Sequence, residues 1–89
     1  MRHDDKKKVL RRLKIIGGQI RGLEKMVGED KYCVDVITQT SAVRSALSGI
    51  EDLLLEGHLA THVVEQMRAG QKGRAVKEIV DLYKLSKRK

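Results

Sequence analysis

Residues 31–67 read KYCVDVITQTSAVRSALSGIEDLLLEGHLATHVVEQM, and this stretch decides the fold. No proline or turn cluster interrupts it, and its apolar positions recur at steps of three and four, as on one face of a helix. These positions are Val36, Val43, Leu47, Ile50 and Leu54, widened by Val34, Ile37, Ala46 and Leu53. The width of the stripe indicates contact with more than one neighbour. We predict one long central helix, although Gly49 and Gly57 weaken the case for an unbroken one.

A further helix is predicted on each side of this stretch. The first covers about Asp5 to Val27, and its apolar seam is Val9, Leu13, Ile16, Ile20, Leu23 and Val27. The last covers about Arg74 to Leu85, with Val76, Ile79, Val80 and Tyr83 on one face. Residues 28–30 and 69–73 are the expected turns. The sequence therefore predicts an all-α fold with three helices per chain, and residues 1–89 as a single domain.

The charge balance points to a polyanionic partner. The chain has 89 residues, with 19 Lys and Arg against 12 Asp and Glu, a net charge of +7. Nucleic acid fits this balance better than an anionic membrane surface does, and a merely solvated charged face is the plainer alternative. The candidate DNA contacts are Lys8, Arg11, Arg12, Lys14 and Arg44. No apolar run reaches the roughly 20 residues of a membrane span, and no signal peptide is visible.

Three side chains form a candidate metal site. His58 and His62 are four residues apart, so a helix places both rings on one face. Cys33 is the only thiol, which excludes an internal disulfide and suits a cytoplasmic protein. Along one helix, however, Cys33 and His58 would lie about 37 Å apart. An antiparallel dimer would bring them together and is the arrangement we favour. A helical hairpin folded near Gly49, or no shared site at all, are the alternatives.

Several segments together resemble the copper-sensitive operon repressor family. They are Tyr32-Cys33-Val34-Asp35-Val36-Ile37-Thr38-Gln39, then Ser41-Ala42-Val43, then Gly57-His58-Leu59 with His62, and Gly18-Gln19 after a basic stretch. The resemblance covers roughly Lys6 to Leu85. It implies an all-α dimer of dimers without a helix-turn-helix reader. It also implies a repressor that binds operator DNA when ligand-free and is released by metal.

The resemblance also implies roles for particular residues. Cys33 and His58 match two of the family's metal ligands, and His62 stands where the copper sensors usually have a second cysteine. Tyr32 and Glu78 match second-shell positions, where a phenol or carboxylate orients the metal-bound imidazole. Arg12 falls where the family has a DNA-contacting arginine.

Copper(I) is the metal that this donor set favours, because a thiolate with two imidazoles suits low coordination numbers. Zinc with an added ligand is an alternative, and so are nickel or cobalt with His3 as an extra ligand. The branches of the family that use an N-terminal proline or a second cysteine do not fit, since the chain has no proline and one cysteine. A non-specific nucleic-acid-binding helical oligomer and a purely structural oligomer are the rival classes. An enzyme is not indicated, since no paired carboxylates, nucleophile–base arrangement or phosphate loop is apparent.

Overall fold

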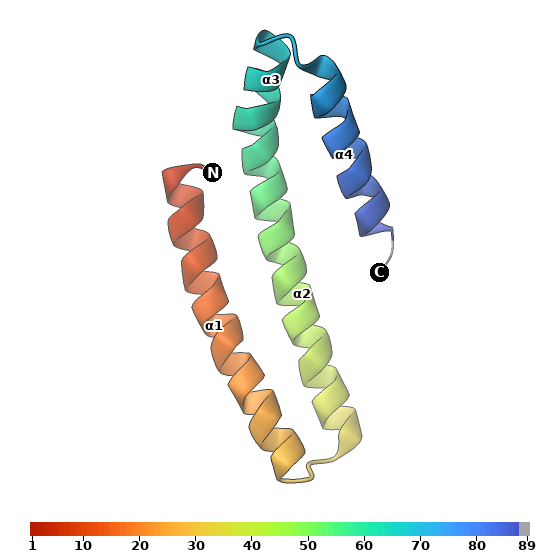
Figure 1. Ribbon diagram of the computed structural model, residues 1–89. Coiled ribbons are helices and arrows are strands. Elements are labelled where there is room, and N and C mark those ends of the chain that lie inside the picture. The colour runs from red at the N-terminus through yellow and green to blue at the C-terminus, as the bar shows by residue number, and fades with distance from the viewer. Residues whose placement is uncertain (88–89) are drawn as a thin grey trace.

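The computed structural model describes residues 1–87 and is helical through almost all of that part (Figure 1). In chain order the elements are α1 (His3–Gly28), α2 (Cys33–His58), the π-helical turn η1 (Leu59–Val63), α3 (Val64–Arg68) and α4 (Lys72–Ser86). The described residues contain no strand. The all-α prediction is confirmed.

The helices form a flat, elongated arrangement. Helices α1 and α2 pair as an antiparallel hairpin, while η1 and α3 extend the line of α2 (Figure 1). Helix α4 then folds back on the other side of the α2–α3 rod from α1 (Figure 1). The principal extents are 56 × 28 × 13 Å. None of the described helices has the length and apolar content needed to cross a membrane.

The central helix is longer and straighter than its glycines suggest. Helix α2 runs through Gly49 and Gly57 without a break, and η1 and α3 carry the helical path on to Arg68. The hairpin folded near Gly49, one of the alternatives raised above, is therefore wrong. The last helix begins at Lys72, two residues before the predicted start, so the turn between α3 and α4 is confined to residues 69–71.

The two turns use the same backbone device. After α1, the N–H of Lys31 donates to the carbonyl oxygen of Met26 at 3.0 Å, and that of Asp30 donates to Val27 at 3.1 Å. After α3, the N–H of Gln71 donates to Gln66 at 2.7 Å, and that of Gly70 donates to Met67 at 3.2 Å. This is the Schellman pattern, which needs a left-handed residue just beyond the helix. Asp30 (φ 53°) and Gly70 (φ 76°) supply it.

The core of the single chain is thin and lies between α1 and α2. Its buried members are Val9, Ile16, Val43 and Ile50, with Leu23, Ala46, Leu53 and Leu54 packed against them. Burial of each such aliphatic side chain stabilises the fold by about 1.5–3 kcal/mol. Few layers of side chains fit into a molecule of this thickness, so the hairpin depends on this short row of contacts.

Two predicted apolar faces are more exposed than expected. In the α1 seam, Leu13 and Ile20 are exposed, because α2 covers only the side of the seam that carries Val9 and Ile16. In α4 the buried residue is Ala75, and Val76, on the predicted face, is 48% exposed. Ala75 begins a second stripe at helical spacing, and Glu78, three residues further on, lies against His58 of α2 and Gln66 of α3. In the single chain the predicted face that carries Val76 is therefore exposed, and the buried position of α4 is the neighbouring Ala75.

Candidate metal centre

Cys33 and His58 are the first and last residues of α2, so the straight helix holds them at opposite ends of the hairpin. Cys33 is exposed. Within the described part of one chain, no three His, Cys, Asp or Glu side chains gather closely enough to hold a metal ion. The structure therefore does not bring the predicted trio together within one subunit.

The two histidines do form a pair. Their ring centroids are 5.3 Å apart with an angle of 32° between the ring planes. His58 closes α2 and is half-buried, while His62 lies in η1 and is exposed. The hydroxyl of Thr61 donates to the carbonyl oxygen of Gly57 at 2.7 Å and ties the π turn to the end of α2. Short π segments within α-helices occur frequently at functional sites.

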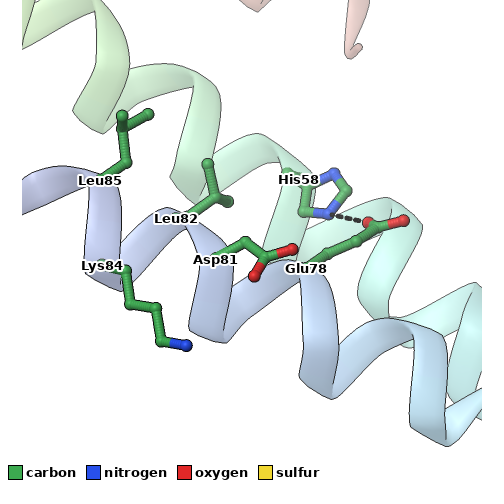
Figure 2. A pocket seen from close by; sticks show the side chains of 6 residues that line it. All are labelled: His58, Glu78, Asp81, Leu82, Lys84 and Leu85. Atoms are coloured by element: carbon green, nitrogen blue, oxygen red, sulfur yellow. Dashed lines mark ion pairs between the residues drawn. The ribbon is translucent and has the colours of Figure 1, made fainter.

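Glu78 of α4 approaches the half-buried histidine. Its Oε2 lies 3.4 Å from Nε2 of His58, as the dashed line in Figure 2 shows. The Nε2 atom is buried and has no partner in hydrogen-bonding geometry among the described residues. An acceptor thus stands beside a ring nitrogen that needs one. The structure thus brings together Glu78 and His58, two of the predicted site residues.

Two further side chains hold Glu78. Arg74 Nε donates to Oε1 at 3.0 Å, and Gln66 Nε2 donates to Oε2 at 3.5 Å. The hydrogen bond from Arg74, followed by that from Gln66, lowers the pKa of Glu78 from its ordinary value. The carboxylate is therefore ionised at neutral pH and available as an acceptor for an imidazole N–H.

His58 lines two cavities. One, of about 630 Å³, is lined by His58, Glu78, Asp81 and Leu82, among others (Figure 2). The other, of about 750 Å³, lies beside both histidines. It reaches Asp5 of α1 and Gly57 of α2. The histidine pair is thus open to an approaching group from another chain.

The remaining predicted ligand-shell residues are Tyr32 and His3. Tyr32 precedes Cys33 at the N-terminus of α2 and is 69% exposed, so within the chain it is at the thiol end of the helix. His3 opens α1 and is exposed. The N-terminal segment reaches His62 through the amino nitrogen of Met1, which is 3.4 Å from Nε2 of that ring.

The five predicted DNA contacts are all exposed. They lie on α1 and α2, and they are Lys8, Arg11, Arg12, Lys14 and Arg44. Arg12 lies beside α2, where its Nη1 would be 3.9 Å from a Cβ atom placed on Gly49. These side chains are free to contact phosphates, and their role in DNA binding remains a prediction.

The sequence reasoning missed an ion pair next to the histidines, in which the carboxylate is buried. Asp5 is only 5% exposed, although it is charged, and its Oδ2 accepts a hydrogen bond from Arg2 Nε at 2.7 Å. Asp5 stands four residues before Val9, the first residue of the α1 seam, and Gly57 continues the stripe of α2 seven residues after Ile50. That spacing was the available signal, since it places both residues on the faces that meet.

Known proteins show the same sequence pattern and fold. Residues 5–84 match the family described as metal-sensitive transcriptional repressor. The chain is 39% identical to the copper-sensing transcriptional repressor CsoR of Bacillus subtilis over 80 residues, which are 90% of this chain and 79% of that protein. It is 46% identical to the copper-sensing transcriptional repressor RicR of Mycobacterium tuberculosis over 63 residues, 71% of this chain and 66% of that protein.

A solved structure is similar along nearly the whole chain. It is the copper-sensing repressor CsoR with Cu(I) from Geobacillus thermodenitrificans. The TM-score is 0.87 at 34% identity, and the match covers 96% of this chain and 88% of the other. The likeness therefore includes α4 as well as the α1–α2 hairpin.

Proposed function

The chain belongs to the metal-sensitive transcriptional repressors, and from this premise we propose that Cu(I) is the metal that it senses. In this proposal the metal-free protein binds operator DNA, and Cu(I) releases it. The relatives from B. subtilis and M. tuberculosis are copper-sensing repressors, and the solved neighbour carries Cu(I). The family consists of repressors and not of enzymes.

The observation that carries the proposal is the placement of the donors along α2. Two imidazoles lie 5.3 Å apart at one end of the helix, and the only thiol lies at the other end. Cys33 of one subunit with His58 and His62 of another would hold the ion. One soft thiolate and two imidazoles are a suitable set for Cu(I), which accepts low coordination numbers. Bound there, the ion supplies bonds that join donors of two chains.

The chain's own residues prepare this site. Glu78 stands beside His58 Nε2 as an acceptor, which would leave Nδ1 of that ring for the ion. Tyr32 would reach the same site from the thiol side, because it precedes Cys33 in sequence. In this arrangement Glu78 would support the site from the histidine side and Tyr32 from the thiol side.

A shared site requires an oligomer, and we assign an antiparallel dimer that assembles into a homotetramer. Many large apolar side chains are exposed on the single chain, which supports this assembly. On the hairpin they include Leu10, Leu13, Ile20, Val34, Ile37 and Leu47. Packing between subunits would cover this surface, which is unusually extensive for a monomer.

The DNA contacts in this proposal are Lys8, Arg11, Arg12, Lys14 and Arg44, acting on phosphates and DNA shape in the cytoplasm. All five are exposed, and the net charge of the chain is +7. The whole chain, residues 1–89, acts as one metal-sensing DNA-binding domain. Since metal and DNA favour different forms of it, each weakens the binding of the other by the same factor.

An anaerobic titration tests the proposal. The probe is a labelled duplex selected from a random library by the metal-free protein, and binding is followed by fluorescence anisotropy at fixed salt. One Cu(I) per chain should lower DNA affinity by about 5–150-fold, the usual range for such coupling. Cys33→Ala should keep the metal-free affinity and lose the response, whereas the control His3→Ala should respond like the wild type.

Two results would contradict this proposal. Unchanged DNA affinity of the wild type on addition of Cu(I) would exclude copper as the sensed metal. Loss of assembly in metal-free Cys33→Ala would show that the cysteine is structural.

Nickel or cobalt is the second candidate, and one observation favours it. The N-terminal segment that carries His3 lies at the histidine pair, with the Met1 amino nitrogen 3.4 Å from His62 Nε2. Additional nitrogen donors there would suit ions with higher coordination numbers. The titration is therefore repeated with Ni(II), Co(II) and Zn(II). A response to Ni(II) or Co(II) that His3→Ala removes would favour this candidate over copper.

A further inference from the structure

A buried charge links α1 to the histidine end of α2. Among the described residues Asp5 is the only charged one that is buried, at 5% exposure. A buried carboxylate is costly unless it is paired, and Arg2 pairs it at 2.7 Å. The hydrogen bond and charge of Asp5 raise the pKa of Arg2, with a smaller contribution from Glu56 of α2. The pair therefore faces α2 as well as its own helix.

The Arg2–Asp5 pair packs against Gly57 of α2. Gly57 is buried, and a Cβ atom at this position would lie 2.6 Å from Asp5 Oδ2 and 3.5 Å from Arg2 Nε. Any other residue would displace the carboxylate. Gly49 on the same helix differs, because a Cβ atom there would meet its nearest neighbour, Arg12 Nη1, at an ordinary 3.9 Å. The close approach is therefore particular to Gly57.

Gly57 is also connected to both histidines. His58 follows it directly, and the Thr61 hydroxyl beside His62 donates to the Gly57 carbonyl at 2.7 Å. Asp5, Gly57 and the two histidines line the same cavity of about 750 Å³. A shift of the histidine turn must therefore move the surface against which Asp5 is packed.

We propose that Asp5, held by Arg2 and seated on Gly57, is a positioning residue that transmits the state of the histidine pair to the basic helix α1. The inference rests on the proposed function and adds the contact through which the two sites communicate. When the ligands of the histidine end take up their metal-bound arrangement, Gly57 moves with them. Because Asp5 is buried and paired, α1 follows and carries its basic side chains with it. Asp5 touches neither metal nor DNA in this scheme.

Three single variants test the proposal: Asp5→Asn, Gly57→Ala and the control Gly49→Ala. Asp5→Asn keeps the shape of the side chain and removes its charge. Gly57→Ala adds a methyl group at the close approach, and Gly49→Ala adds the same group where there is room. The readout is the ratio of DNA affinities without and with Cu(I), measured with the selected duplex. Cu(I) affinity is measured separately by competition with a chelator.

We expect Asp5→Asn and Gly57→Ala to reduce this ratio at least about fivefold, the lower limit of typical coupling. Both should still bind one Cu(I) per chain, because the ligands are intact. Gly49→Ala should keep the wild-type ratio. The double variant Gly57→Ala with Asp5→Ser removes the steric conflict but not the need for the carboxylate, so its ratio should stay low.

Each other result overturns the proposal. Wild-type ratios in Asp5→Asn and Gly57→Ala would show that the contact does not couple the metal site to DNA binding. A restored ratio in the double variant would show that the contact matters only for packing. Should Gly57→Ala fail to fold, Asp5→Asn decides, because it adds no non-hydrogen atoms. A wild-type protein that ignores Cu(I) is a different failure: it overturns the proposed function itself, and this inference with it.

Discussion

Glu78 is the residue through which α4 touches the histidine pair. Its hydrogen bond with Arg74 stays within α4, four residues apart, and so fixes the carboxylate but not the helix. Its contacts with Gln66 of α3 and His58 of α2 cross between elements. Removing Arg74 should therefore loosen the carboxylate, whereas removing Glu78 should loosen α4 from the site.

The free energy of unfolding at acidic pH should depend on the ionisation of Glu78. Its pKa is lowered in the folded chain, first by Arg74, from an ordinary value of 4.5. A lowered pKa stabilises the fold above the unfolded value, and this contribution is lost as the pH falls through the folded value. The wild type should therefore exceed Glu78→Gln in stability by a constant amount down to about pH 5 and by progressively less below that.

Urea unfolding of the metal-free protein over a pH series measures this difference. Arg74→Gln should shrink the pH-dependent part, because Arg74 is the largest cause of the shift. Parallel curves for the wild type and Glu78→Gln down to pH 3 would contradict the assignment.

At the scale of elements, the helices are joined by two turns that share a backbone pattern but differ in the residue at its left-handed position. Both need a left-handed residue beyond the helix, and the chain places Asp30 in one and Gly70 in the other. Asp tolerates this conformation better than most residues, but glycine adopts it without steric conflict. The first turn is therefore the more strained of the two.

Substitutions at these two positions should have opposite effects on the free energy of unfolding. Asp30→Gly should raise it by about 0.5 kcal/mol, because relief of strain exceeds the entropy that glycine adds to the unfolded chain. Gly70→Ala should lower it by about 1 kcal/mol or more. Urea denaturation of both variants beside the wild type gives the two values. A less stable Asp30→Gly would mean that the carboxylate makes stabilising contacts in the turn.

The elements themselves could be predicted from sequence, because uninterrupted three–four spacing and the turn residues mark them. Which stripe of α4 faces inward could not, since Ala75 and Val76 begin stripes of similar spacing. From sequence alone, the glycines of α2 indicate weak points of the helix. In the structure Gly57 is instead a place of close approach, and that role depends on the partner helix, which local sequence does not reveal.

The candidate site was predictable to a similar extent. Helical spacing alone pairs His58 with His62 and separates both from Cys33. The position of Glu78 came from family resemblance, because nothing near α4 in the sequence indicates its partner. Asp5 resembles an ordinary acidic residue at a helix start, and only its phase with the α1 seam suggests that it is buried.

At the scale of the molecule, a thickness of 13 Å leaves little interior. The hairpin buries one row of aliphatic side chains and leaves many others exposed. In the proposed assembly, the missing packing comes from other copies of the chain. Folding and association should then be coupled, as they are in obligate oligomers.

Stability should therefore depend on protein concentration. The melting temperature should rise when the concentration is raised about 100-fold, because association favours the folded form. Ile20→Lys should weaken this dependence and reduce the mass found by sedimentation, since Ile20 is an exposed member of the α1 seam, at 45%. Ile15→Lys, off the seam and 60% exposed, is the control and should keep the wild-type mass. A concentration-independent melting temperature would contradict the coupling.

The placement of Cys33 and His58 at the two ends of α2 has a consequence for the middle of that helix. In an antiparallel pair that joins each thiol to the partner's histidines, the twofold axis passes midway between them, near residues 45–47. In this proposed arrangement a side chain there, such as Leu47, would face its own copy. A single substitution near residues 45–47 would therefore place two identical new side chains against each other. Only residues that can pack against their own copy would be tolerated at this point.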